Sequence, residues 1–148
     1  MKGKVAIVIG FIMMIWLQSC EQAKTSYDLN KLQGYWEISS VEKQGQLVKQ
    51  YQISPIIDYW QFNADSSGFR KKVMPNLEGK IVITQHQMPF TLTLKEDHVQ
   101  VAYDDNGNRY VEQIITLEDS LLVITNSEFI EYTYKRYKPI DLSDVTKE

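Results

Sequence analysis

Apolar and polar residues alternate along most of the chain from Gly34 onward, and turn-forming residues interrupt this alternation at regular intervals. A period of two places successive side chains on opposite faces of a β-strand, so the pattern predicts strands. The predicted strands cover residues 34–42, 58–63, 68–74, 80–86, 90–95, 98–103, 109–117, 120–126 and 129–137. No stretch after residue 20 has convincing helical periodicity, which predicts an all-β fold.

The segments between these strands are short and polar, which predicts hairpin connections. Residues 104–108 contain Asn106-Gly107, a pair that favours a two-residue hairpin turn because both residues tolerate positive φ. The acidic start of this segment is also seen in calcium loops, but the position of the bidentate Glu is occupied by Ile115. Sequential short hairpins make an antiparallel up-and-down meander. We expect it to close into a barrel of about 8–10 strands, since closure removes unpaired edges.

One face of the predicted strands is rich in aromatic residues and becomes the barrel interior. Two interpretations of this face remain open at this point: the rings fill a packed core, or they line a pocket for a small apolar or amphipathic ligand. The candidate ligand-binding residues are Trp60, Phe62, Phe90, Tyr103, Tyr132 and Tyr134. Outward-facing tyrosines, Tyr35, Tyr59 and Tyr137, are candidates for a contact with a partner.

The first twenty residues form a separate unit. Lys2 and Lys4 precede a run without charges from Val5 to Leu17, which is too short for an ordinary membrane span and is typical of a secretory signal. The following Leu17-Gln18-Ser19-Cys20 resembles a bacterial lipobox, with Gln18 as a departure from the usual small or apolar residue. The alternatives are an uncleaved anchor helix and a buried core cysteine.

The lipobox resemblance implies that Cys20 is alkylated with diacylglycerol and that the chain is cut before it. We then expect a signal peptide at 1–19, a lipidated Cys20 with a flexible tether at 20–31, a barrel domain at 32–138 and a tail at 139–148. The expected partner is a bacterial membrane, bound through the lipid. The residues after Cys20 are not a long acidic run, which favours the periplasmic face of the outer membrane.

The start of the predicted barrel carries a family resemblance. Gly34-Tyr35-Trp36 resembles the Gly-x-Trp opening of lipocalin-like domains, and Arg136 occupies the position of a basic residue near the end of the last strand. The pairing of this pattern with a lipobox resembles the lipocalin-like lipoproteins of Bacteroidetes-type bacteria. The resemblance implies a barrel closed at one end by Trp36, with Arg136 over its ring in a cation–π contact. The alternative is a core tryptophan and a solvated arginine.

Closure by Trp36 and Arg136 requires an even number of strands, because both residues must lie at the same end of the barrel. The nine predicted strands are odd in number. Either 80–86 and 90–95 form one bent strand interrupted at Met88-Pro89, or residues 47–53, within the irregular segment 44–57, add a tenth.

Composition narrows the function. The net charge is −3 and becomes more negative without Lys2 and Lys4, so nucleic-acid binding is not expected. A single Cys forms no internal disulfide, and with His86 and His98 it leaves too few ligands for a structural zinc site. We expect no metal and no cofactor. The only basic run, Arg70-Lys71-Lys72, is expected at a solvated strand end.

No cluster of titratable residues supports a catalytic mechanism, so we expect no enzyme activity and name no catalytic residues. Two function classes remain. The first is a lipid-anchored binding protein of the cell envelope whose barrel holds a small apolar or amphipathic ligand. The second is an accessory subunit of an envelope protein complex, with a packed barrel and a functional outer surface.

Overall fold

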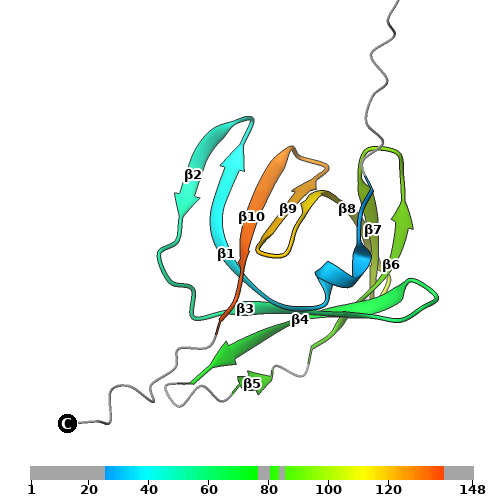
Figure 1. Cartoon of the computed structure of the whole chain (residues 1–148), viewed down its shortest axis with the longest axis horizontal. Coiled ribbons are helices and arrows are strands. Elements are labelled where there is room, and N and C mark those ends of the chain that lie inside the picture. The colour runs from blue at the N-terminus through cyan, green and yellow to red at the C-terminus, as the bar shows by residue number, and fades with distance from the viewer. Residues whose placement is uncertain (1–25, 77–80, 84–85, 139–148) are drawn as a thin grey trace, which may run out of the picture.

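A computed structural model describes residues 26–76, 81–83 and 86–138, and contains one short 3₁₀ helix and ten strands (Figure 1). The expected signal peptide at 1–19, Cys20 and the expected tail at 139–148 lie outside the described residues. The elements are η2 (Leu29–Leu32), β1 (Gly34–Lys43), β2 (Gln46–Gln50), β3 (Ile57–Phe62), β4 (Ser67–Pro75), β5 (Ile81–Ile83), β6 (Met88–Leu94), β7 (Val99–Asp105), β8 (Asn108–Leu117), β9 (Leu121–Asn126) and β10 (Ile130–Arg136).

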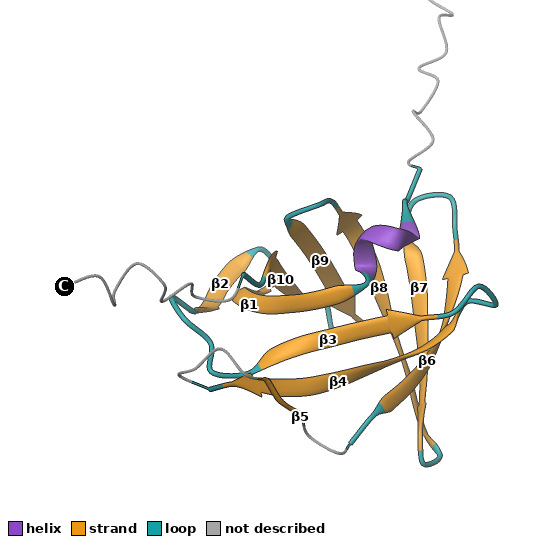
Figure 2. Cartoon of the chain, turned by 60° about the horizontal axis from the view of Figure 1, so that its bottom comes forward, coloured by secondary structure: helices purple, strands orange, loops and turns teal. Residues whose placement is uncertain are grey.

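Eight of the strands form a closed antiparallel barrel. Their order is β10-β9-β8-β7-β6-β4-β3-β1, and the ring closes because β10 also pairs with β1. Each neighbour in the ring is the next barrel strand along the chain (Figure 2), with β2 between β1 and β3 in sequence and β5 between β4 and β6. The predicted all-β, up-and-down barrel is therefore confirmed.

Two further strands, β2 and β5, explain why the number of predicted strands was odd. β5 pairs with residues 73–75 of β4, and β6 pairs with residues 67–70 of the same strand. The other edge of β4 is occupied by β3, so β5 and β6 share one edge and together count as one interrupted barrel strand. β2 continues a hairpin from β1 within the segment 44–57. Both alternatives raised by the sequence thus contribute, and the barrel itself has an even number of strands.

The β7–β8 connection is the two-residue hairpin expected from its Asn-Gly pair. Asp105 and Asn108 pair across the turn, and Asn106 and Gly107 have φ angles of 53° and 87°. Positive φ at both central positions matches the right-handed twist of the flanking strands. This segment is therefore a structural turn.

The two ends of the barrel are built differently. At one end, called the closed end below, η2 lies beside the first residues of β1, and Leu32 is fully buried in the core. The β6–β7 and β8–β9 turns lie at this same end, where Tyr27 donates a hydrogen bond to the carbonyl of Asp97 at 2.7 Å. Tyr27 and Leu29 pack against the core as well. Residues 27–31, expected as part of a flexible tether, instead belong to the folded domain, because their apolar side chains cover this end.

The opposite end, called the open end, carries the β1–β2, β7–β8 and β9–β10 turns. Gln44 in the first of these turns donates a backbone hydrogen bond to Phe129 in the last. Between the two ends lies a core of residues from η2 and seven of the ring strands: Leu32, Trp36, Trp60, Phe90, Leu92, Val99, Val101, Tyr103, Ile114, Leu117, Leu122, Ile124 and Tyr134.

Candidate functional site

Arg136 and Trp36 close one end of the barrel. They are paired residues on β10 and β1, and the Arg136 guanidinium carbon lies 3.9 Å from the centroid of the Trp36 ring. The guanidinium donates hydrogen bonds to the carbonyl oxygens of Gln33, Lys31 and Asp119, while Trp36 Nε1 donates to Leu32 at 2.8 Å. This arrangement matches the geometry implied by the family resemblance, and it ties η2 and the β8–β9 turn to the last strand.

The structure places the six candidate ligand-binding residues together inside the barrel. Trp60 lies 5.3 Å from Phe90 and 6.5 Å from Tyr103, measured between ring centroids, and all three rings are buried. Tyr134 is buried beside them, whereas Phe62 and Tyr132 are partly buried and pack against the same core. The middle of the barrel is therefore filled by aromatic side chains.

The basic run on β4 does not lie at a solvated strand end. Arg70 is only 7% exposed, because alternation along β4 turns it into the barrel beside Trp60, its cross-strand partner. Lys71 points to the outer face, where its ammonium lies over the rings of Tyr59 and Phe69. The expectation of a solvated run was wrong for Arg70, since three consecutive residues of a strand cannot share one face.

Arg70 is the centre of a buried polar cluster. Its Nη2 donates to Asp58 at 2.9 Å and to the Tyr134 hydroxyl at 2.7 Å. Its Nη1 donates to Glu112 at 3.2 Å and to the Tyr103 hydroxyl at 3.3 Å. We call Asp58, Arg70, Tyr103, Glu112 and Tyr134 the Arg70 cluster. The guanidinium carbon also lies 4.8 Å from the centroid of the Trp60 ring, so the cation rests on an aromatic face.

The charges in the Arg70 cluster stabilise one another. Burial alone would raise the pKa of Asp58, but Arg70 and Lys72 outweigh it and hold that pKa below its ordinary value. Lys72 contacts the second oxygen of Asp58 at 2.6 Å. Burial also raises the pKa of Tyr103 and of Tyr134, so both hydroxyl groups stay protonated, and Tyr103 donates to Glu112. A buried cation is thus matched by two carboxylates.

Inward-facing residues toward the open end remain accessible to solvent. Tyr110 stacks on Tyr103 with ring centroids 4.5 Å apart and is 37% exposed. Tyr132 and Met88 are half-buried, although both pack against the core. The Glu112 side chain is 14% exposed, which makes it the most accessible charged member of the Arg70 cluster. Solvent therefore reaches the interior face at this end as far as Glu112.

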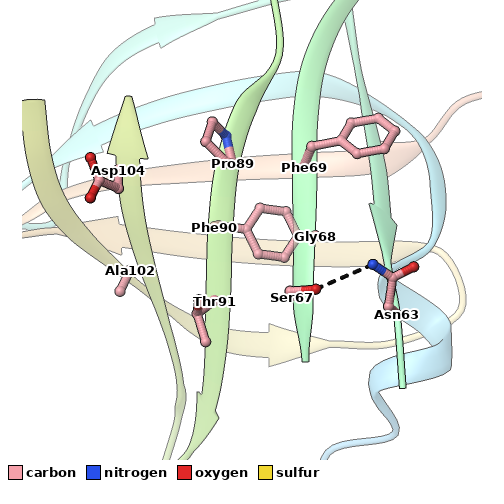
Figure 3. A pocket seen from close by; sticks show the side chains of 9 residues that line it. All are labelled: Asn63, Ser67, Gly68, Phe69, Pro89, Phe90, Thr91, Ala102 and Asp104. Atoms are coloured by element: carbon pink, nitrogen blue, oxygen red, sulfur yellow. Dashed lines mark hydrogen bonds between the residues drawn. The ribbon is translucent and has the colours of Figure 1, made fainter. Parts of the chain in front are cut away.

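Two grooves lined by described residues lie on the outer wall of the barrel. The first, of about 400 Å³, crosses β4, β6 and β7 and is lined by Ser67, Phe69, Pro89, Thr91 and Asp104 among others (Figure 3). The second, of about 350 Å³, lies along β8 and β9 beside Phe129, whose ring is 73% exposed. Neither groove opens on the candidate ligand-binding side chains, apart from the edge of Phe90 in the first.

The family model of the lipocalin-like domain matches residues 32–124. The chain belongs to the lipocalin-like domain family. The match begins at Leu32, the last residue of η2, and runs into β9, so it includes Trp36 and the Arg70 cluster up to Glu112.

Two solved structures to which the chain is similar come from Bacteroides species. A lipocalin-like protein from Bacteroides uniformis ATCC 8492 has 11% identity and a TM-score of 0.44, with 72% of this chain and 99% of that chain covered. An uncharacterized protein from Bacteroides eggerthii DSM 20697 has 15% identity and a TM-score of 0.43, with 71% and 98% covered. No curated protein matches the chain.

Two further findings concern metals and membranes. Among the described residues, no three His, Cys, Asp or Glu side chains are grouped so that they could hold a metal ion. His86 and His98 are each paired with an aspartate, Asp105 and Asp97 respectively. Within the residues that the structure describes, no helix is long and apolar enough to cross a bilayer.

Proposed function

We propose that this lipocalin-like protein is a lipid-anchored, non-enzymatic binding protein of the bacterial cell envelope, and that its barrel takes a small amphipathic ligand through the open end. The asymmetry of the barrel carries the proposal. Trp36, Arg136 and η2 cover one end, whereas half-exposed aromatic residues and Glu112 face inward at the other. A site with apolar walls and a few polar groups is typical of small-molecule pockets.

The test is recovery of a bound molecule. The full chain is produced in a bacterial host that processes lipoproteins, purified in a neutral detergent, and analysed by native mass spectrometry and solvent extraction. We expect a co-purifying small amphiphile in stoichiometric amount. The control is a Tyr110→Arg, Tyr132→Arg double variant, which fills the open end with charge and should lose the molecule. A mass equal to that of the lipidated chain alone would contradict the proposal.

Anchoring by lipid is tested at the cysteine. Cys20→Ser removes the only thiol in the chain, so we expect complete loss of radiolabelled palmitate incorporation and release from the outer-membrane fraction. The physical reason is that acyl chains contribute about 0.8 kcal/mol for each buried CH₂ group, and no other part of the mature chain is expected to bind lipid. Gln18→Ala keeps the thiol and should retain the label. Label on the Cys20→Ser chain would contradict the lipid assignment.

An accessory subunit of an envelope complex is the second candidate, and the outer wall favours it. Both grooves lie outside the barrel, and Tyr35 and Tyr59 form a half-buried aromatic pair on the same outer surface, with ring centroids 4.8 Å apart. This candidate requires a stoichiometric protein partner in a pull-down from solubilised membranes, together with an empty barrel in the mass measurement.

A further inference from the structure

Glu112 is the most exposed charged member of the Arg70 cluster at the open end. Its side chain is 14% exposed, against 3% for Asp58 and 8% for Arg70. Only one of its carboxylate oxygens is used: Oε2 accepts both from Arg70 at 3.2 Å and from Tyr103 at 2.9 Å. Within the described part of the chain, Oε1 has no hydrogen-bond partner. One acceptor of a partly buried carboxylate is therefore available to a ligand.

Tyrosine rings lie near this carboxylate. Tyr103 donates its hydroxyl to Glu112, and Tyr110 stacks on Tyr103 with an interplanar angle of 16°. Tyr132 lies close enough that, after burial, the charge of Glu112 is the next largest cause of its raised pKa. Tyr110 is affected by burial and by Glu112 in the same way. A carboxylate among electron-rich ring faces is a favourable environment for an organic cation.

The same contacts disfavour a ligand whose headgroup is an anion or an uncharged apolar group. All four terminal N–H groups of Arg70 are already donated within the Arg70 cluster, and an anion would approach Glu112 before it reached them. The remaining buried donors, Arg70 Nε and Trp60 Nε1, are fully enclosed. An uncharged apolar group over Glu112 would desolvate Oε1 without giving it a partner, which is unfavourable. Lys72 also faces this end, but its ammonium contacts Asp58.

We propose that the ligand of this barrel is an amphipathic cation, whose ammonium-type headgroup binds Glu112 Oε1 between Tyr110 and Tyr132 while its apolar part lies among the half-buried side chains of the open end. The inference rests on the proposed binding function and adds the chemical class of the ligand. The headgroup contributes a charge-assisted contact to the carboxylate and cation–π contacts to the rings.

The experiment compares three probes with the same tail: octyltrimethylammonium, octanoate and octan-1-ol. Each is titrated calorimetrically into the purified full chain in neutral detergent. We expect the ammonium probe to bind at least about tenfold more tightly than either of the others. Glu112→Gln should remove this preference while octan-1-ol binding is retained, because the amide keeps the size of the side chain. Glu118→Gln, at an exposed turn, is the matched control and should bind all three probes as the unaltered chain does.

A second variant covers the case in which Glu112→Gln fails to fold by circular dichroism. Tyr110→Leu keeps an apolar side chain at an exposed position but removes the ring, and should weaken only the ammonium probe. Equal or tighter binding of octanoate, or an ammonium preference that survives both variants, would overturn the inference and leave the proposed binding function standing. Binding of none of the three probes would instead count against the binding function itself.

Discussion

Replacing Arg70 with Met is expected to destabilise the barrel by about 3–5 kcal/mol, because it leaves buried carboxylates without their cation. Asp58 is 2% exposed and would keep only Lys72 as a charged partner, while Glu112 would lose its ion pair. The measurement is urea unfolding at pH 7, followed by circular dichroism. Lys71→Met, the neighbouring change on the outer face, is the control and should cost less than about 1 kcal/mol.

Acidification should affect the free energy of unfolding in opposite directions in the unaltered chain and in Arg70→Met. In the unaltered chain, Arg70 and Lys72 keep the pKa of Asp58 below its ordinary value, so the stabilisation from Asp58 is present above about pH 4 and is lost as pH falls through the folded pKa. Without Arg70, burial is opposed only by Lys72, so we expect the pKa of Asp58 to rise. Protonation of Asp58 then removes the buried charge. The loss of unfolding free energy caused by Arg70→Met should therefore be smaller at pH 5 than at pH 7. A deficit that does not change with pH would show that lost packing, not uncompensated charge, causes the destabilisation.

Trp36→Ala is expected to have an effect of similar size, about 3–5 kcal/mol, since it empties the space of a fully buried ring at the closed end. It also removes the surface on which Arg136 rests and the hydrogen bond to Leu32. Trp36→Phe keeps an aromatic face under the guanidinium and should lose only part of that free energy. Both are measured by the same urea titration. An Ala variant as stable as the Phe variant would mean that the ring does not hold this end together.

The alternation of the chain was sufficient to predict the barrel, because a strand with one buried face specifies its own register. Eight of the nine predicted strands match within about two residues at each end. The exception is 80–86, of which the structure describes 81–83 and 86 and assigns Ile81–Ile83 to β5. The role of this segment could not be predicted, since the sequence does not show which edge of β4 it shares. Pairing with the same edge as β6 is a long-range choice that local propensity leaves open.

The candidate site was predicted only in its apolar part. The aromatic residues were found because they repeat at alternate positions, whereas Asp58, Arg70 and Glu112 interrupt that repeat and are most simply interpreted as solvated. Their burial depends on pairing across the barrel: Arg70 lies opposite Trp60 on β3, and Glu112 comes from the other side of the ring. The position of each charged residue along its strand could have shown that its side chain faces inward. Asp58 and Arg70 share their faces with Trp60 and Gly68, so strict alternation directs both charged side chains inward.

The location of Tyr27 determines how the barrel would stand on a bilayer. Its hydroxyl is fixed to the carbonyls of Asp97 and Ile115 at the closed end. With lipid on Cys20, seven residue steps separate the anchor from this point, a reach of about 25 Å when fully extended. Under the proposed lipid anchor, the Trp36 end would lie nearer the phospholipid headgroups than the open end beside Glu112. A ligand would have to arrive from solution or from a soluble carrier rather than by lateral diffusion out of the membrane that holds the protein.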